Sequence, residues 1–402
     1  MIIKMAFKNL LRHKKRTALT LITTIVGILL AVIGEGLNSG LEKQVSDLSI
    51  KSEISYGRIF GKNFYEDKDN NDILEYPINM KSVKGLENVP ISKRISFTGS
   101  ITDSKEELAT YFMGVNKIDE NKVFSRDKYI ISGSFLNNDN DVVIGEELAN
   151  LLNLKVGDDV TLMARTVIKS QNAYDLKVTG IIKTGNPIFD SKAVFLNETF
   201  AREFSGADFY NEIIVGKILD TPLENILKSS DIDYVTYKEE LKDVLAIAQL
   251  RRKVFGTLSS AILVMASLTI TNTMLMAMLE RKKEIGVLMA NGMNDKKILK
   301  MFFTEGLTNG ALGCLIGFML GSILTFYLEK VGIPFKFNSN DLGLTLPFAD
   351  RLYLYYNFKK SIVFPLIGLI FISIASFYPA YMDTKLNPSE ATKGRYNVKN
   401  DF

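Results

Sequence analysis

The chain has 402 residues, of which 47% are hydrophobic and 23% charged, and its formal net charge is +4. This length predicts two or three folding units, and the small net charge gives a nucleic-acid partner no electrostatic support. A single cysteine, Cys314, excludes an intrachain disulfide framework, and with one histidine, His13, we expect no metal site and no histidine-based triad.

Four uncharged stretches are long and apolar enough to cross a bilayer. A helix needs roughly 20 such residues to cover about 30 Å of hydrocarbon. Buried core helices are the alternative, but soluble cores rarely need four uncharged runs of this length. The sequence therefore predicts four transmembrane helices, the last three at about 254–279, 303–328 and 361–382. The uncharged stretches are Thr17 to Gly34, Val254 to Leu279, Gly306 to Leu328 and Ser361 to Met382.

The first stretch could also belong to a secretory signal peptide, because it follows basic residues. Its apolar run is longer than the usual core of about 7–15 residues, and no A-x-A cleavage site follows. We therefore expect it to stay in the protein, with residues 1–41 forming a cytoplasmic tail and the first transmembrane helix.

Lysine and arginine in the short segments indicate the orientation. They crowd residues 1–16, the connector 280–300 and the C-terminal tail, which places these three segments in the cytoplasm. Residues 42–250 then form a large extracytoplasmic domain, and 329–360 a short outer loop. Basic residues at 251–253 and 359–360 oppose this assignment, although long domains translocate largely regardless of charge.

The segment 42–250 has the pattern of a mixed α/β domain. Apolar runs bounded by Gly and Asp indicate strands, and apolar residues at helical spacing indicate helices. The predicted strands are Asp141–Gly145, Val160–Ala164, Leu176–Ile182 and Ala193–Leu196, and the predicted helices are Glu146–Leu154, Pro222–Leu227 and Leu241–Leu250. The last helix would lead directly into the second membrane span as a stalk.

Few residues suggest catalytic chemistry. The chain has no G-x-x-x-x-G-K-[ST] phosphate loop. The acidic clusters Glu66–Asp69 and Asp139–Asp141 lack the spacing of a calcium loop and are read as solvated turns. Glu35 and Glu305 stand at the rims of predicted spans, where an interfacial carboxylate is expected rather than a transport residue. We expect no bound cofactor and no catalytic site.

Glycines in the third span recur every three or four residues and form one small-residue face. Such faces let helix backbones approach closely in lipid. The face could pack within the chain or against a second copy, and the spacing leaves both open. Its members are Gly306, Gly310, Gly313, Gly317 and Gly321.

The segment 280–292 is the most unusual in the chain. Charged residues crowd the exit of the second span, and Ile285, Leu288 and Met289 then form an apolar stripe on a short predicted helix that Gly292 would cap. Such a helix suits the membrane surface or a partner's groove equally well. The residues singled out are Glu280, Arg281, Glu284, Ile285, Gly286, Leu288, Ala290 and Gly292.

This segment resembles the E-R-x-x-E-I-G-x-x-x-A-x-G pattern of the FtsX-like permeases of ABC transporters. Two further regions are similar to the same family, an N-terminal A-x-x-N-L-x-R-x-x-x-R-T pattern and a C-terminal pattern, in which Asp383 stands where the family usually has Ala. The outer segment resembles the MacB-like periplasmic core domain. The matching residues are Ala6, Asn9, Leu10, Arg12, Arg16 and Thr17, then Gly145–Ala149, Val156–Asp158 and Thr184–Asp190, and finally Pro379, Ala380, Leu386, Pro388, Glu390 and Ala391.

The resemblance implies a permease subunit of an ABC transporter in the inner membrane. Two copies of a separate cytoplasmic ATPase would bind ATP, and a second permease, identical or different, would complete the assembly among membrane lipids. Segment 280–292 would be the coupling helix that docks on the ATPase, residues 42–250 the periplasmic core and 251–402 the FtsX-like permease domain. ATP hydrolysis would thereby do mechanical work at the outer face of the membrane.

The resemblance is closest to the lipoprotein-releasing permeases of the LolC and LolE type, carried by Tyr56–Ile59 and Phe64–Tyr65. This implies a lipoprotein cargo and a periplasmic carrier. One alternative is a MacB-like exporter of peptides, toxins or antibiotics, which usually carries its own ATPase domain. Another is an FtsX-like regulator of cell-wall hydrolases, whose outer domain is typically smaller. A membrane sensor without an ATPase is the remaining alternative.

Overall fold

The fold is described from a computed structural model that covers residues 14–65, 72–83, 85–103, 106–220, 224, 227, 231–334 and 351–384. Several sequence predictions lie outside these residues. They are the N-terminal motif up to Arg12, His13, the acidic cluster Glu66–Asp69, most of the helix Pro222–Leu227, and the C-terminal motif from Leu386. The chain divides into two compact units, each described by itself.

Unit 1 contains residues from 1–41, 247–333 and 353–402 and is built from helices. Four helices of the described chain are long and apolar enough to cross a membrane, as the sequence predicted. Three of them run 36 to 39 residues, well beyond the uncharged windows seen in the sequence. The helices are α2 (Lys14–Ser49), α9 (Lys242–Glu280), α10 (Lys282–Ala290), α11 (Asp295–Val331), α12 (Phe358–Ser361) and α13 (Val363–Thr384).

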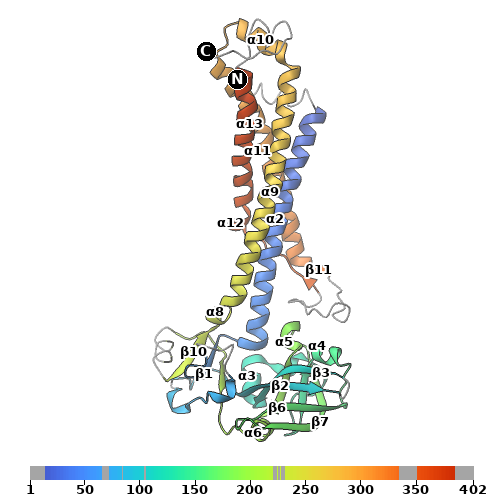
Figure 1. The fold of residues 1–402 in the computed structure, drawn as a ribbon, viewed down its shortest axis with the longest axis vertical. Helices are drawn as coiled ribbons and strands as arrows, with labels where there is room; N and C mark the ends of the chain where they lie inside the picture. Colours follow the sequence, from blue (N-terminus) through green and yellow to red (C-terminus); the bar gives the residue numbers. More distant parts are fainter. Residues whose placement is uncertain are drawn as a thin grey trace. The chain divides into compact units, whose positions relative to one another are not determined.

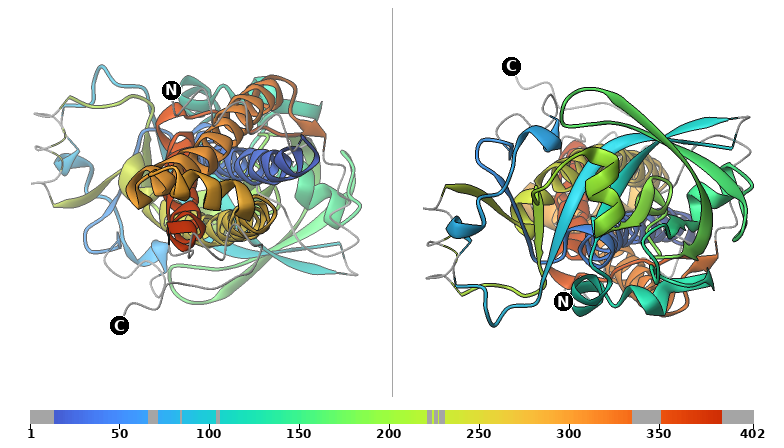
Figure 2. Two further views of the ribbon diagram at one scale, coloured as in Figure 1. Left: turned by 90° about the horizontal axis from the view of Figure 1, so that it is seen from above. Right: turned by 90° about the horizontal axis from the view of Figure 1, so that it is seen from below.

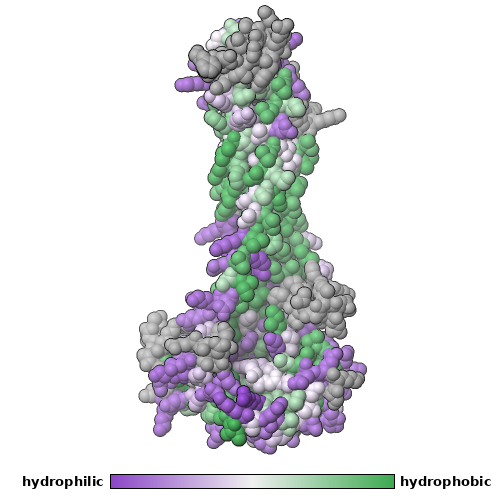
Figure 3. All heavy atoms as spheres, viewed as in Figure 1, coloured by the Kyte–Doolittle hydropathy of each residue, from purple (hydrophilic) through white to green (hydrophobic). Residues whose placement is uncertain are grey.

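The long helices of unit 1 lie side by side as a bundle (Figures 1 and 2). Side chains from all four helices meet in one buried cluster, which includes Ile28, Leu263, Cys314 and Ile372. Hydrophobic residues dominate the outer surface of the bundle (Figure 3), as expected where lipid replaces water. The large apolar side chains on this surface include Leu19, Leu258, Met265, Ile323 and Ile370.

Unit 2 contains residues from 42–246 and 334–352, and its centre is a mixed ten-stranded sheet. The strand order is β10-β1-β9-β2-β3-β8-β5-β7-β4, and β6 pairs with β2 and β7. The strands are β1 (Gly57–Gly61), β2 (Ile91–Thr102), β3 (Glu107–Val115), β4 (Ile130–Gly133), β5 (Val142–Gly145), β6 (Asp159–Arg165), β7 (Gln171–Ile182), β8 (Ala193–Asn197), β9 (Glu212–Val215) and β10 (Ile232–Thr236); β11 (Ile333–Pro334) and β12 (Arg351–Leu352) form a separate pair.

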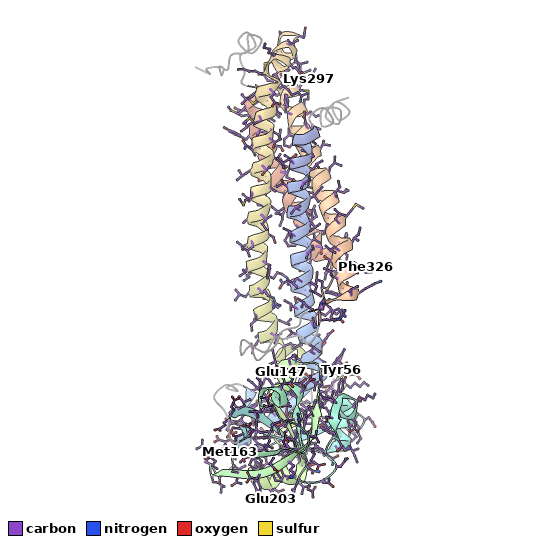
Figure 4. All side chains as sticks on the ribbon, turned by 90° about the vertical axis from the view of Figure 1, so that its right-hand side faces the viewer. Tyr56, Glu147, Met163, Glu203, Lys297 and Phe326 are labelled. Atoms are coloured by element: carbon purple, nitrogen blue, oxygen red, sulfur yellow. The ribbon has the colours of Figure 1, made fainter. Side chains whose placement is uncertain are left out.

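Short helices pack around the sheet of unit 2. Tyr56 and Glu147 lie on one side of this unit and Glu203 on the opposite side (Figure 4). The helices are η1 (Ile50–Ile54), η3 (Ile73–Glu75), η4 (Met80–Ser82), α3 (Lys117–Phe124), η5 (Arg126–Tyr129), α4 (Glu146–Leu151), α5 (Pro187–Asp190), α6 (Glu198–Ser205) and α8 (Tyr237–Glu240).

The α/β pattern predicted for this segment is confirmed. Strands β5, β6 and β8 and helix α4 begin and end within a few residues of the predicted positions, whereas β7 begins five residues earlier than predicted. The predicted stalk at Leu241–Leu250 is the first part of α9. Six strands of the sheet were not predicted, namely β1, β2, β3, β4, β9 and β10.

The core of unit 2 is divided at one place in the sheet. Strands β1, β9 and β10 support a hydrophobic cluster around Ile59 and Ile213. The strands from β2 onward support two further clusters, a large one around Phe97 and a smaller one around Phe195. Only four residue pairs, from Ile91–Val215 to Arg94–Glu212, join β9 to β2 across this division.

Candidate functional site

Helix α10 connects two of the long helices of unit 1, α9 and α11, at one end of the bundle (Figure 1). Lys297, near the start of α11, lies at the same end, and Phe326 marks the far part of α11 (Figure 4). The segment predicted as a short helix from 280 to 292 is therefore a separate helix, broken from α9 at Arg281 and from α11 by residues 291–294.

Gly292 ends α10 in the way its position in the sequence suggests. Its φ of 85° is the left-handed conformation that favours glycine. The Gly292 amide donates to the Met289 carbonyl over 3.0 Å, and the Met293 amide donates to the Leu288 carbonyl over 3.1 Å. These two bonds form a Schellman motif, which satisfies the last carbonyls of the helix.

The apolar stripe of α10 faces the chain's own helices. Ile285 is only 1% exposed and belongs to a cluster with Ile298, Phe302 and Ala380. Leu288 and Met289 are partly buried and pack against the same cluster. The stripe therefore contributes to attaching α10 to α9, α11 and α13, and docking of α10 on a partner stays a prediction.

Arg281 ties the beginning of α10 to α11. Its Nη1 lies 3.3 Å from a carboxylate oxygen of Glu305, and its Nε lies 3.3 Å from Glu284. The guanidinium also lies over the ring of Phe302, 5.8 Å from its centre. Glu305, predicted as a rim carboxylate, is thus an ion-pair partner, and the Arg281 side chain is only 10% exposed.

The opposite face of α10 is exposed. Val287 is 52% exposed and lies between polar neighbours at helical spacing. The exposed residues of α10 and its C-terminal turn are Lys283, Glu284, Val287, Ala290, Asn291 and Gly292. We call this set the outward face of α10. It combines both signs of charge with the apolar side chains of Val287 and Ala290.

The small-residue face of α11 meets two different helices. A Cβ added to Gly306 would lie 2.5 Å from the Ser376 hydroxyl oxygen, and one added to Gly310 would overlap the Ile372 side chain. Both neighbours belong to α13, so the first part of the face lies against that helix.

The remaining three glycines of this face lie against α2. A Cβ at Gly313 would lie 2.8 Å from the Thr24 Cβ, and one at Gly317 would lie 2.7 Å from the Ile25 carbonyl oxygen. A Cβ at Gly321 would lie 3.0 Å from the Val32 Cβ. Of the two possibilities that the spacing leaves open, the structure shows close packing within the chain.

Glu35 of α2 is buried, with 7% of its surface exposed, and has two partners. It accepts a hydrogen bond from Ser39 over 2.9 Å and lies 3.5 Å from Arg252 of α9. The neighbouring Arg251 donates to the Asn38 side chain over 2.8 Å. Arg251 and Arg252, two of the basic residues that oppose the predicted orientation, therefore contact side chains of α2.

A group of buried charges in unit 2 was not singled out from the sequence. These residues are scattered over five elements, so no single motif contains them. One signal was present: Arg94 stands inside an otherwise strand-like run, where an unpaired charge would be costly. The buried group is Arg58, Arg94, Glu120, Arg126 and Glu212.

Two protein-family models match this chain, one over each of its main segments. The model of the MacB-like periplasmic core domain matches residues 17–221, about half of the chain. The model of the FtsX-like permease C-terminal region matches residues 256–388. The chain belongs to the MacB/FtsX-like family of ABC transporter permeases. The resemblance inferred from the sequence motifs is thereby confirmed.

Individual relatives are similar at low identity. The chain is 25% identical to an uncharacterized ABC transporter permease, MJ1507, of Methanocaldococcus jannaschii, over 98% of both chains. It is 27% identical to the macrolide export ATP-binding/permease protein MacB of Campylobacter jejuni, covering 96% of this chain and 60% of that protein. It is 25% identical to the lipoprotein-releasing system transmembrane protein LolE of Haemophilus influenzae, over 75% of this chain and 76% of the relative.

Proposed function

We propose that this permease works as the membrane subunit of an ABC transporter whose ATPase is a separate cytoplasmic chain. The observation that carries the proposal is the outward face of α10, which is exposed although the rest of the helix is packed. An ATPase that docked on this face would push on α9 and α11 together, because Arg281 and the buried Ile285 hold α10 to both. In this proposal two ATPases serve two permeases.

The proposal includes an orientation in an inner membrane. Residues 1–41 would hold a cytoplasmic tail and the first span, and α10 would be cytoplasmic. Residues 42–250 would be the extracytoplasmic core domain, and 251–402 the permease domain. The basic residues Lys283, Lys296, Lys297 and Lys300 near α10 support this, since cytoplasmic loops are enriched in lysine and arginine.

We propose lipoprotein extraction and release toward an outer membrane as the work done, with a soluble carrier as acceptor. The relative named LolE supports this reading, because the chain matches about three quarters of its length. Export of peptides, toxins or antibiotics is the second candidate. The relative named MacB supports it, although the chain spans only 60% of that protein. Regulation of cell-wall hydrolases is a third, resting on the FtsX-like model alone.

Variants of α10 test the ATPase contact. Lys283→Glu and Val287→Asp change the outward face without touching Arg281 or the buried stripe, so both should fold normally and lose an ATPase that co-purifies in mild detergent. Asp139→Lys, an exposed charge reversal in unit 2, is the matched control and should retain it. Wild-type ATPase recovery in both α10 variants would rule out docking on this face.

Leu288→Ala separates docking from folding. Because Leu288 packs on the chain's own cluster, this variant should lower the free energy of unfolding by about 1–3 kcal/mol in the purified chain alone.

Mass spectrometry of the wild-type preparation identifies the cargo. Acylated lipoproteins support release, whereas small peptides or antibiotics in their place would support export.

A further inference from the structure

Two connections join the helices α2 and α9 to the sheet of unit 2. Helix α2 continues directly into the π-helical turn η1, and α8 ends two residues before α9 begins. These connections are neighbours: the Tyr237 amide of α8 donates to the Tyr56 carbonyl over 3.2 Å, and the two tyrosine rings meet edge to face with centres 6.1 Å apart. The backbone is strained between η1 and β1, where the buried Ser55 has φ 50°. Such a conformation persists only where its surroundings hold it.

Buried ion pairs begin at η1. The Arg126 Nη2 donates to the carbonyl of Ser52 in η1 over 2.7 Å. The Arg126 Nε lies 3.0 Å from Glu120, whose same oxygen accepts from the Arg94 Nη2 over 2.8 Å. These three side chains are at most 1% exposed. The turn that follows α2 is therefore held by a charged cluster in the interior of the unit.

A second set of buried ion pairs begins at α8. Glu240, the last residue of α8, accepts from the Arg58 Nη1 over 2.8 Å. The Arg58 Nε donates to Glu212 over 2.8 Å, and the Glu212 side chain is fully buried. The short helix that precedes α9 is thus held in the same manner as η1, through a charged side chain of the sheet.

The two sets meet where the sheet is divided. Arg94 of β2 and Glu212 of β9 are directly opposite each other in the strand pairing. The Arg94 Nη1 lies 3.9 Å from the Glu212 Oε2, the longest separation in the series. Positive and negative side chains alternate from one connection to the other: Arg126, Glu120, Arg94, Glu212, Arg58 and Glu240.

The charges in this series depend on one another. Burial alone would raise the pKa of Glu120, but Arg94 and Arg126 lower it to about 2. Burial would likewise raise the pKa of Glu212, and Arg58 and Arg94 hold it below its ordinary value. Removing one member of a buried ion pair leaves the charge of its partner uncompensated. This destabilises the fold much more than replacing both members.

We propose that this alternating series is a clamp that fixes the η1 and α8 connections to each other, with Arg94–Glu212 as its weakest link. The residues of the clamp are positioning residues: they hold η1 and α8 in one arrangement. The clamp goes beyond the proposed function, because it concerns the chain alone and stands whatever the cargo is.

Hydrogen exchange of the purified full chain in lipid nanodiscs, without ATPase, tests the clamp. Glu212→Gln removes the charge at the centre of the series. It should make amide exchange at least about tenfold faster in both connections, residues 50–55 and 237–245. The matched control is Glu198→Gln, which removes a carboxylate bonded to Arg202 and Tyr210 in the same unit. It should leave both connections unchanged.

Faster exchange confined to β1, β2 and β9 in Glu212→Gln would overturn the clamp, because a purely local role predicts that pattern. If Glu212→Gln does not fold, a double-mutant cycle decides the matter. Glu120→Gln and Glu240→Gln affect opposite ends and share no arginine. A clamp predicts that their losses in Tm do not add, since either variant already releases the series. Additive losses would show two independent ion-pair groups and refute the proposal.

Discussion

The side-chain amide of Asn309 in α11 donates a hydrogen bond of 2.7 Å to the hydroxyl of Thr20 in α2, and both residues are buried. This bond lies on the helix pair that Gly313, Gly317 and Gly321 bring together. In an apolar environment, polar bonds of this kind hold helices together.

Loss of this bond should weaken the bundle measurably. Asn309→Leu should lower the unfolding free energy by about 0.6–2 kcal/mol in detergent, because the hydrogen bond from Asn309 in α11 to the Thr20 hydroxyl in α2 is lost. Thr20→Val should cost about as much, and the double variant little more than either. Asn272→Leu, on an exposed position of α9, is the control. An Asn309→Leu chain that melts like the wild type would show that the bond contributes nothing.

The glycine face leads to a second prediction. Gly317→Ala places a methyl group 2.7 Å from the Ile25 carbonyl oxygen, so α2 and α11 must separate, and thermal stability should fall. Gly34→Ala is the control because nothing lies within 4 Å of the added carbon, and there the better helix propensity of Ala should raise stability slightly. Equal melting temperatures for the two variants would contradict this packing.

Cysteine labelling checks the orientation proposed for the membrane. In a Cys314→Ala background, Asn140→Cys in unit 2 should react with an impermeant maleimide added from outside. Lys297→Cys at the start of α11 should react only after the membrane is opened. Both positions are exposed in the structure, so access to the protein surface is not limiting. If only Lys297→Cys is labelled from outside, the orientation in the membrane is the reverse of the one proposed.

Asp190 should make the stability of unit 2 depend on pH near neutrality. Burial raises the pKa of its carboxyl from 3.8 to about 7, although Thr184 donates two hydrogen bonds to it, Arg126 opposes the rise and Glu146 adds to it. The folded chain therefore keeps a proton that the unfolded chain releases above about pH 4. Stability is therefore lost progressively as the pH rises from about 4 to about 7, by up to about 4 kcal/mol in all, and levels off above the folded pKa.

The measurement compares wild type with Asp190→Asn. The wild-type melting temperature of unit 2, followed by tyrosine circular dichroism, should be higher at pH 5 than at pH 8. Asp190→Asn carries no titrating carboxyl and should reduce that difference. An equal difference in melting temperature between pH 5 and pH 8 in both proteins would assign the pH dependence to another group.

Parts of this fold could be predicted from the sequence because their signals are local. Uncharged runs such as Val254–Leu279 identify spans by length alone, and the pattern around Val142–Leu151 contains a strand and a helix with a turn signal behind them. Strand β2 was missed because Arg94 and Ser96 interrupt its apolar pattern. Their partners, Glu120 and Glu212, stand 26 and 116 residues away in the chain.

The sequence located the candidate site at α10 but did not show which face of this helix is buried. Helical spacing grouped Ile285, Leu288 and Met289 on one face of α10. Which side that face turns toward depends on Ile298 and Ala380, which lie on other helices and reach α10 only in the folded chain. The glycine spacing in α11 likewise could not reveal that two neighbouring helices share one face.

That shared face restricts how α11 can move. Advancing one position along a helix turns the side chain by about 100°, so a rotation of α11 about its own axis would drive Leu315, Ile316 or Leu320 into spaces that now hold only glycine hydrogens. These three side chains are 57%, 37% and 46% exposed. Axial rotation of α11 is therefore blocked from two sides at once, by α13 near Gly310 and by α2 near Gly317. If an ATPase pushes on α10 as proposed, α11 would have to tilt or shift without rotating, and α2 and α13 would move with it.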